Sequence, residues 1–218
     1  MEIRLEHIKK DYIRGSRVQT VLEDIDVRIP PGCFWLVKGH SGSGKSTLLH
    51  IISGLIAPTS GTVFYDEEKL ADMSDDRRAA LRSSRIAIVT QDDSLIPYLT
   101  IHENINLPAF IGGDLPKEDE KQREESIEKF LDVAGIRELK EEYPPHLSGG
   151  EIRRVAIVRA LAQKPEVVIM DEPTANLDYE NVEKVLQLLR RVADEGTTVI
   201  IASHESEAEA YVDRSIGL

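Results

Sequence analysis

A glycine-rich segment in the first quarter of the chain carries the residue types that bind phosphate groups. It fits the pattern G-x-x-x-x-G-K-[ST] and consists of Gly39, His40, Ser41, Gly42, Ser43, Gly44, Lys45 and Ser46. Glycines let backbone N–H groups turn toward phosphate oxygens, and the N-terminus of a following helix adds its positive dipole end. Lys45 would then supply a positive charge to the β- and γ-phosphates, and the Ser46 hydroxyl would bind Mg²⁺. The segment therefore predicts a nucleoside triphosphate site, with Thr47 at the α-phosphate and the side chain of His40 facing solvent.

Two adjacent carboxylates, Asp171 and Glu172, end a second apolar segment, VVIMDE. A strand of this kind beside a phosphate loop is expected to deliver its Asp to the Mg²⁺ shell, so we assign Asp171 to the metal through water. Glu172 is one residue further on and points elsewhere, where it can polarise an attacking water as a general base. The alternative for Glu172 is a paired surface carboxylate. A kinase with a phosphate loop would instead transfer the phosphoryl group to a second substrate.

A third segment, LSGGE, places two glycines at the start of a predicted helix. Ser148 and Glu151 alone fit a capping box, in which each side chain caps the backbone N–H of the other residue. That interpretation does not explain Gly149 and Gly150, because paired glycines suit the close approach of backbone donors to an anion. The segment is therefore a second candidate for binding an anion.

Short runs rich in β-branched residues predict the strands that position these segments. Alternation of apolar and polar residues between 3 and 29, broken at IRGSR, predicts two strands joined by a turn. Further strands are predicted at CFWLVKG, IAIV, EVVIMDE and TTVIIAS, with helix-like segments such as STLLHIISGL between them. Buried strands that alternate with helices are typical of a parallel sheet. We expect an α/β fold, namely a P-loop NTPase core with a mainly parallel sheet and an N-terminal antiparallel β subdomain.

The character of the chain changes between residues 100 and 163. Long polar stretches there carry apolar residues at helical spacing, such as Ile127, Phe130, Leu131 and Ala134. This pattern predicts a helical subdomain inserted into a single nucleotide-binding domain that spans residues 1–218. Residues 1–99 and 164–218 would then form the ATP-binding α/β core.

Composition and charge exclude several classes of protein. The 218 residues include 27 basic and 39 acidic side chains, and the resulting net charge of −12 disfavours a protein that grips nucleic acid. Cys33 is the single cysteine, which suits a reducing compartment. The start of the chain is charged throughout, and no apolar run approaches the ~18 residues of a membrane span. The chain is therefore expected in the cytosol.

The segments GHSGSGKST, LSGGE, VVIMDEP and ANLD occur in this order and resemble those of the ATP-binding cassette (ABC) ATPases over nearly the whole chain. The resemblance implies that Tyr12 stacks on the adenine and that Gln91 contacts both Mg²⁺ and the attacking water. It also implies that His204 is the switch histidine at the γ-phosphate. The expected catalytic residues are thus Glu172, His204, Gln91 and Lys45, and the expected metal ligands are Ser46, Gln91 and Asp171.

In this family, two cassettes enclose two ATP molecules, and each site combines residues of both subunits. The resemblance implies that Ser148, Gly149 and Gly150 bind the γ-phosphate held by a second copy of the chain, and Glu151 of the same segment is included among the nucleotide-binding residues. The residues Asn176, Leu177 and Asp178 match the loop at the dimer interface, and Asp178 is included among the nucleotide-binding residues. ATP and Mg²⁺ are the expected cofactors, and a homodimer is the expected assembly.

The segments LRSSRIAIVTQ and LTIHENINLP are similar to those of cassettes from lipoprotein-release and macrolide-efflux systems. This similarity implies an integral membrane transport subunit as partner and a place on the inner face of the cell membrane. A candidate docking surface follows residue 91 and contains Leu95, Ile96, Tyr98 and Leu99, although these residues could equally pack inside the cassette.

Two other functions fit part of the pattern. One is a soluble ABC ATPase that acts on ribosomes or DNA, but such proteins usually carry tandem cassettes or long coiled-coil insertions, and the net charge disfavours nucleic acid as a partner. The other is a regulatory module that binds nucleotide without turnover. This second function is disfavoured because Lys45, Asp171, Glu172 and His204 are all present.

Overall fold

A parallel sheet forms the middle of the molecule in the computed structural model, which describes residues 1–91, 94–111 and 120–218. Its strand order is β6-β7-β8-β3-β9, and every neighbouring pair runs in the same direction. The strands are β3 (Phe34–Lys38), β6 (Ile86–Val89), β7 (Val167–Asp171), β8 (Thr198–Ser203) and β9 (Arg214–Gly217). The mainly parallel sheet expected from the sequence is confirmed.

Alternate residues of the central strands face two different hydrophobic cores. In β3, Phe34 and Leu36 belong to one core, whereas Trp35 and Val37 belong to the other. Strands β7 and β8 divide in the same way. Because successive side chains of a strand point to opposite faces, an uninterrupted apolar strand requires cover on both sides of the sheet.

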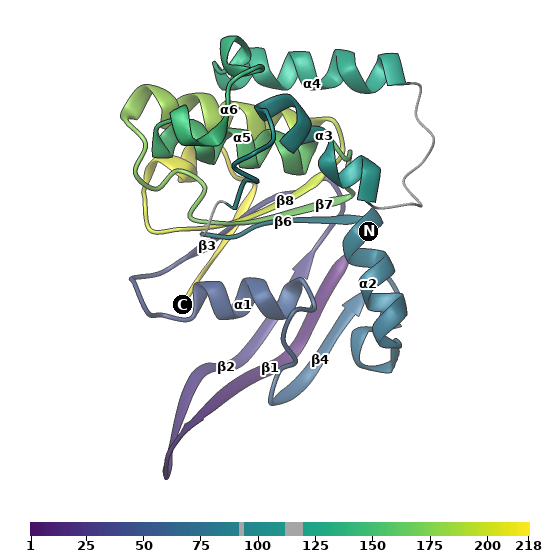
Figure 1. Ribbon diagram of the computed structural model, residues 1–218. Coiled ribbons are helices and arrows are strands. Elements are labelled where there is room, and N and C mark those ends of the chain that lie inside the picture. Colours follow the sequence, from purple (N-terminus) through teal and green to yellow (C-terminus); the bar gives the residue numbers. More distant parts are fainter. Residues whose placement is uncertain (92–93, 112–119) are drawn as a thin grey trace.

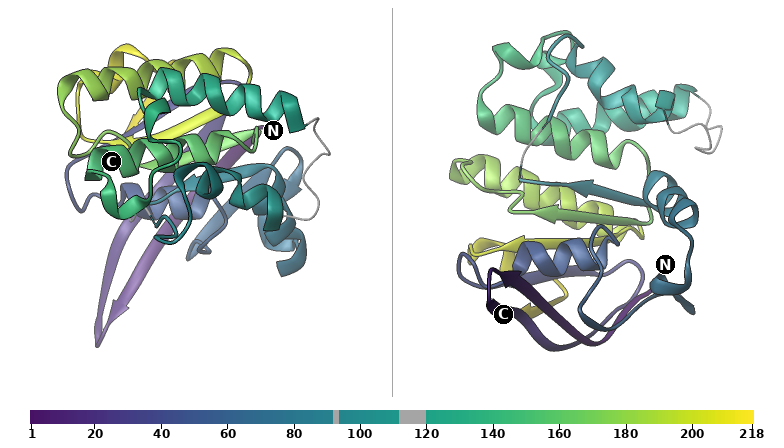
Figure 2. Two further views of the ribbon diagram at one scale, coloured as in Figure 1. Left: turned by 45° about the horizontal axis from the view of Figure 1, so that its top comes forward. Right: turned by 60° about the horizontal axis from the view of Figure 1, so that its bottom comes forward.

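Helices and a second sheet supply this cover, so that the molecule has four layers (Figure 1). One face of the parallel sheet carries α3 (Ile101–Ile111), α4 (Glu120–Ala134), α5 (Gly149–Leu161) and α6 (Tyr179–Asp194). The other face carries α1 (Lys45–Ile52), which separates it from the antiparallel sheet, and α2 (Asp75–Ser84) lies at the margin (Figure 2). Short 3-10 helices occupy Leu70–Asp72, Arg137–Leu139, Pro144–His146 and Glu207–Ala210.

The antiparallel sheet has the order β2-β1-β4-β5 and confirms the predicted N-terminal β subdomain. Its strands are β1 (Ile3–Arg14), β2 (Arg17–Ile29), β4 (Ser60–Tyr65) and β5 (Glu68–Lys69). The turn at Gly15 and Ser16 joins β1 to β2 where the sequence predicted it. The tip of this hairpin projects away from the other layers (Figure 1).

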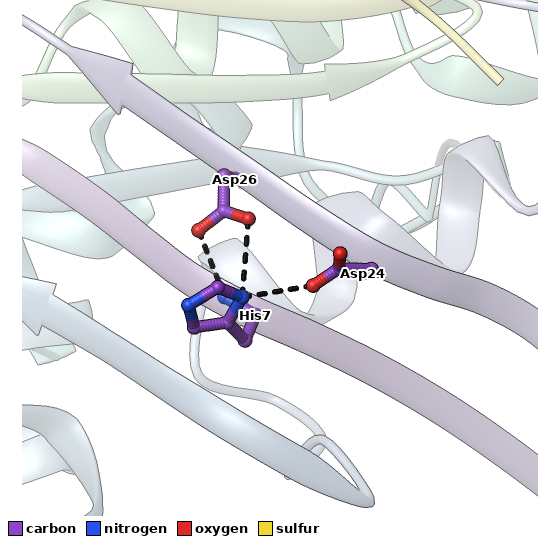
Figure 3. Close-up of side chains that lie close together, drawn as sticks. All are labelled: His7, Asp24 and Asp26. Atoms are coloured by element: carbon purple, nitrogen blue, oxygen red, sulfur yellow. Dashed lines mark hydrogen bonds and ion pairs between the residues drawn. The ribbon is translucent and has the colours of Figure 1, made fainter.

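Irregularities in the β1–β2 pair correct the simple alternation expected between residues 3 and 29. The register shifts between Leu5 and Ile8, and both His7 and Asp24 have positive φ angles, of 50° and 53°. These irregularities change which residues face the core, so that Leu22 is buried and Val21 only half-buried. They also bring together His7, Asp24 and Asp26 on the surface of the sheet (Figure 3).

The region expected to be a helical subdomain contains α3, α4 and α5, and residues 112–119 within it lie outside the described part of the chain. The boundaries at 100 and 163 remain a prediction. In the part of the chain that the structure describes, no helix is both long enough and apolar enough to cross a membrane.

Candidate functional site

The carboxyl ends of the parallel strands bring distant segments of the sequence to one edge of the sheet. In the register of the sheet, Lys38 at the end of β3 lies beside Ser203 of β8, and Asp171 at the end of β7 lies beside Ala202. The glycine-rich loop follows β3 directly, and His204 follows β8. Ligands of open α/β sheets characteristically bind at this edge, so the topology alone nominates it as the site.

A cleft of about 780 Å³ opens at this edge. Residues of the hairpin, the glycine-rich loop and the strand ends line it, namely Tyr12, Ile13, Arg14, Gln19, Val21, Ser41, Gly42, Gly44, Lys45, Ser46, Thr47, Gln91, Asp171, Glu172, Ala175, Asn176 and His204. Its volume is within the usual range for a pocket that binds a small molecule. The structure therefore brings together the candidate catalytic residues and the candidate metal ligands.

The glycine-rich loop is shaped by its own glycines and by its contact with β2. Gly44 caps the N-terminus of α1 with a φ of 105°, a conformation that disfavours side chains. A Cβ atom at this position would lie 2.9 Å from a methyl carbon of Val21 and 3.0 Å from one of Leu22. Glycine is required there by backbone conformation and by packing, and the N-terminus of α1 consequently faces the cleft.

Lys45, Glu172 and His204 form a chain of polar contacts inside the cleft. The buried Lys45 Nζ donates hydrogen bonds to the carbonyl oxygens of Gly39 (2.8 Å) and His40 (3.3 Å), and it lies 3.3 Å from Glu172 Oε1. Glu172 Oε2 lies 3.0 Å from His204 Nδ1. The carboxylate is therefore held between a buried ammonium and an exposed imidazole.

The two carboxylates at the end of β7 differ in their surroundings. Asp171 Oδ1 is buried and accepts no hydrogen bond from the described residues. Glu172 has a positive φ of 50°, which is uncommon for a residue with a side chain, and its carboxylate contacts Lys45 and His204. Its backbone N–H donates to Ala202 O (2.9 Å), and the buried Thr174 hydroxyl donates to Glu205 Oε2 (2.5 Å). These contacts tie the segment after β7 to β8 and to the segment that follows β8.

Ser148, which caps α5, and the first two residues of the helix, Gly149 and Gly150, form what we call the signature end of α5. The capping box is present, because Glu151 Oε2 accepts from the Ser148 N–H (2.7 Å) and Ser148 Oγ accepts from the Glu151 N–H (3.4 Å). Hydrogen bonds from the Ser148 hydroxyl and then from its N–H lower the pKa of Glu151 below its ordinary value. A carboxylate that helps to form a cap in this way stays ionised.

The segment before α6 lies against the signature end. A Cβ atom at Gly150 would come within 2.9 Å of Leu177 Cδ2. Asp178 caps α6 by accepting hydrogen bonds from the N–H (2.9 Å) and the side chain (2.8 Å) of Asn181, and the first of these contributes most to lowering the pKa of Asp178. Ser148, Gly149, Gly150, Glu151 and Asp178 do not belong to the described lining of the cleft.

Several other residues around the site differ from the sequence interpretation or were not identified by it. Ile13, Arg14, Gln19 and Val21 line the cleft and were missed, although their place beside Tyr12 on a predicted hairpin was a usable signal. Gly39, His40 and Ser43 belong to the loop without lining the cleft, and the side chain of His40 is exposed as expected. Lys38, the last residue of β3, forms an ion pair with Glu209 (3.0 Å) and does not belong to the described lining of the cleft.

The apolar residues after Gln91 divide between packing and exposure. Leu95 packs against the larger core, whereas Ile96 and Tyr98 are 40% and 87% exposed. The fully buried Asn104 of α3 holds this loop, because its amide donates to the carbonyl oxygens of Ile96 (3.1 Å) and Leu99 (3.0 Å). The packing interpretation is thus confirmed for Leu95, and the docking surface at Ile96 and Tyr98 stays a prediction.

Known proteins are similar to this chain in sequence and in fold. A family model described as ABC transporter matches residues 22–175. The lipoprotein-releasing system ATP-binding protein LolD of Shewanella frigidimarina (strain NCIMB 400) is 38% identical over 215 residues, which cover 98% of this chain and 88% of that protein. The uncharacterised ABC transporter ATP-binding protein YknY of Bacillus subtilis (strain 168) is 36% identical, with coverage of 98% and 91%.

Solved structures agree with these relatives. A dimeric structure of the ABC transporter cassette MJ0796, a protein of Methanocaldococcus jannaschii, has a TM-score of 0.89 at 36% identity and covers 99% of this chain and 94% of that chain. A dimeric post-hydrolysis state of the same cassette bound to ADP and Pi has a TM-score of 0.88 at 35% identity, with the same coverage. Family match, identity and fold coincide over almost the whole length, so the chain belongs to the ABC transporter family, as an ATP-binding and ATP-hydrolysing cassette.

Proposed function

We propose that this ATPase works as a homodimer in which each ATP lies between the cleft of one copy and the signature end of α5 of the other copy. The observation that carries the proposal is the separation within one chain. Lys45, Asp171, Glu172 and His204 line the cleft, whereas the signature end is outside its described lining. Two glycines and a capped helix N-terminus suit an anion, and a second copy can supply one in its own cleft.

The glycine-rich loop and the hairpin would hold the nucleotide. Backbone N–H groups from Gly39 to Ser43 and the N-terminus of α1 would surround the phosphates, while Lys45 exchanges its contacts with loop carbonyl oxygens for phosphate oxygens. Thr47 would reach the α-phosphate. Tyr12 is 40% exposed on the hairpin, beside the Lys10 ammonium at 5.2 Å, and offers an aromatic face to the adenine.

The residues at the strand ends fit Mg²⁺. Carboxylate, hydroxyl and amide oxygens are the donors that Mg²⁺ prefers, and Ser46, Gln91 and Asp171 supply them in one cleft. The buried Asp171 Oδ1, which has no hydrogen-bond partner among the described residues, needs a water or a cation of this kind. When bound, Mg²⁺ neutralises charge on the β- and γ-phosphates.

Glu172 is proposed as the general base for hydrolysis. It accepts the proton of a water that attacks the γ-phosphorus, and its two oxygens are oriented by Lys45 (3.3 Å) and His204 (3.0 Å). When ATP draws the ammonium of Lys45 toward the phosphates, one carboxylate oxygen is released to face the water. His204 then lies beside the γ-phosphate, where it can donate a hydrogen bond.

The partner that this ATPase drives is proposed to be an integral membrane transport subunit of the lipoprotein-release type. The relatives described above are transporter subunits, so they support this partner over the ribosome or DNA alternative. Large apolar side chains are exposed in α3 and in the loop before it, at Ile96, Tyr98, Phe110 and Ile111. Such exposure is typical of a surface that another protein covers. Through this partner the chain would lie on the inner face of the membrane.

Dilution tests the composite site. The ATPase rate per molecule should fall as the protein is diluted, because complete sites exist only in dimers. A rate per molecule that stays constant over the whole dilution series would contradict the composite site, and an inactive chain at every concentration would contradict the ATPase assignment.

Purification from native membranes in mild detergent tests the partner. A stoichiometric multi-span protein should accompany the unaltered chain, and less of it should accompany Ile96→Ser or Tyr98→Ser. Leu55→Ser is the matched control, because Leu55 is a similarly exposed aliphatic residue (48%) in the turn after α1. Recovery of ribosomes or DNA instead would contradict the transporter proposal.

A further inference from the structure

A buried arginine links the signature helix to the segment that carries Gln91. Arg153 of α5 is only 4% exposed, and its guanidinium donates hydrogen bonds to two consecutive carbonyl oxygens, those of Thr90 (Nη1, 3.1 Å) and Gln91 (Nη2, 3.2 Å). The planar fork of arginine is suited to such paired acceptors, which a flexible lysine ammonium does not match. Hydrogen bonds from a charged donor are also stronger than bonds between neutral groups.

These two carbonyl groups lie just beyond the parallel sheet. The pairing of β6 with β7 ends at Val89 and Met170, so Thr90 and Gln91 are past the last paired residue of the strand. Arg153 therefore fixes the position at which the chain leaves the sheet and enters the cleft. The Gln91 carbonyl is held by α5, while residue 91 lines the cleft beside Asp171 and Glu172.

The same helix begins at the signature end, which is about one turn from Arg153. A shift of α5 consequently moves the backbone of Gln91 together with Ser148, Gly149 and Gly150. In the proposed dimer, Gln91 acts on the ATP bound in the cleft of its own subunit, whereas the signature end binds the ATP held by the other subunit.

We infer that Arg153 is a positioning residue, which sets the side chain of Gln91 at the metal and the attacking water by holding the Gln91 carbonyl oxygen to α5. The inference rests on the proposed function, because Gln91 matters to hydrolysis only if it contacts these groups. Arg153 does not belong to the described lining of the cleft, so it would act through Gln91.

The neighbouring Arg154 provides a matched comparison. It is in the same helix, is similarly buried (7% exposed) and also donates to backbone carbonyl oxygens. Its partners are Ala134 (2.8 Å), Gly135 (3.3 Å) and Gly150 (3.3 Å), which lie in the helical region and not beside the cleft. Loss of a buried arginine can therefore be separated from loss of the Gln91 contact.

A double-mutant cycle on ATP hydrolysis tests the inference. We would measure kcat and the KM for ATP in hydrolysis, and the half-saturating Mg²⁺ concentration in an equilibrium binding titration with a non-hydrolysable ATP analogue, for Arg153→Gln, Gln91→Ala and the double variant. Arg153→Gln should lower kcat and raise the half-saturating Mg²⁺ concentration, each on the order of tenfold, with KM for ATP nearly unchanged. The double variant should be no worse than Gln91→Ala alone, because both changes remove one function.

The control cycle pairs Arg154→Gln with Gln91→Ala, and its effects on kcat should multiply. Arg153→Lys should raise the half-saturating Mg²⁺ concentration less than Arg153→Gln does, because lysine keeps a buried charged donor but lacks the planar guanidinium. If Arg153→Gln fails to fold, Arg153→Lys takes its place in the cycle. The inference would be overturned, while the proposed function stands, if the effects of Arg153→Gln and Gln91→Ala on kcat multiplied in the double variant. It would also be overturned if the Arg153 cycle and the Arg154 cycle showed the same coupling energy. Absence of hydrolysis by the unaltered chain would overturn both.

Discussion

Glu172 is the residue at which binding of ATP and its hydrolysis can be separated. Glu172→Gln keeps a side chain of the same shape near Lys45 and His204 but removes the base, so kcat should fall by at least about a hundredfold while ATP binding persists. We expect an ATP-bound dimer to accumulate, which size-exclusion chromatography with ATP would detect. Glu207→Gln is the control, because it removes one exposed negative charge outside the cleft and should hydrolyse ATP normally. Hydrolysis by Glu172→Gln at the parent rate would show that Glu172 is not the base.

A second residue-scale prediction concerns the surface group of His7, Asp24 and Asp26 (Figure 3). The hydrogen bond to Asp24 (2.8 Å) and then the charge of Asp26 raise the pKa of His7 above its ordinary value. Protonated His7 is therefore favoured in the folded state. The stabilisation is complete below the ordinary pKa of about 6.5 and disappears as the pH rises through the higher pKa of the folded state.

Asp24→Asn tests this pH dependence and keeps a residue type that tolerates the positive φ at this position. In denaturant unfolding, Asp24→Asn should lower the free energy of unfolding at about pH 5.5, and it should lower it less at about pH 8.5. In a His7→Gln background, the effect of Asp24→Asn should no longer depend on pH. An equal loss at both pH values in the presence of His7 would contradict the assignment.

Residues of the phosphate loop were predictable because their pattern is contiguous and its chemistry is local. Arg153 was not, because it acts on carbonyl groups 63 and 62 positions away, and hydrophobic periodicity gives no signal for such a contact. The irregular register at His7 and Asp24 was missed for a similar reason. A bulge exchanges the faces of a strand without changing the types of residue in it.

At the scale of elements, Asn104 controls the loop between the cleft and α3. Its side chain accepts from the Ile96 N–H (2.8 Å) and donates to carbonyl oxygens of Ile96, Leu99 and Thr100. Asn104→Ala removes the side-chain partner of the Ile96 N–H and of the Leu99 carbonyl oxygen, so the free energy of unfolding should fall by about 3 kcal/mol. Capture of the membrane partner should weaken as well, because the exposed Ile96 and Tyr98 lose their fixed positions.

Asn106→Ala is the matched control for this prediction. Asn106 is also buried in α3 (6% exposed), but its amide contacts the carbonyl oxygen (3.0 Å) and ring (3.1 Å) of His102 within the same helix. Chemical denaturation should show a smaller loss of about 1 kcal/mol, and partner capture should be retained. Equal loss of capture in both variants would contradict a specific role of Asn104.

The elements themselves were predictable to different degrees. The strands around β3, β7 and β8 followed from apolar runs, since both faces of these strands are buried. Their order in the sheet did not follow, because the neighbours of β3 are β8 and β9, which come more than 150 residues later. Residue patterns specify where a strand lies in the sequence, and packing of the whole chain specifies its neighbours.

At the scale of the whole molecule, Gly149 distinguishes the stability of one chain from assembly of two. Apart from its chain neighbours and the nearby backbone of α5, a Cβ atom at Gly149 would meet no heavy atom of the described chain within 4 Å. Gly149→Ala should therefore leave the monomer as stable as before or more stable by up to about 1 kcal/mol. In the proposed dimer the same methyl group would meet the partner's γ-phosphate. ATP-dependent dimerisation, measured by sedimentation in the Glu172→Gln background, should therefore weaken at least tenfold. Gln187→Ala, at an exposed position of α6, is the control and should dimerise normally.

Mixing two inactive variants then tests whether the composite site is responsible. Lys45→Met removes the phosphate-binding charge of the cleft and keeps the signature end intact. Gly149→Ala keeps the cleft intact and disrupts the signature end. Each mixed dimer contains one complete site, formed by the cleft of the Gly149→Ala copy and the signature end of the Lys45→Met copy. Random mixing makes about half of the dimers mixed, so roughly a quarter of the parent ATPase rate should return if the sites act independently. If each chain instead used its own signature end, both copies in every mixed dimer would lack an essential group, and mixing would restore no activity.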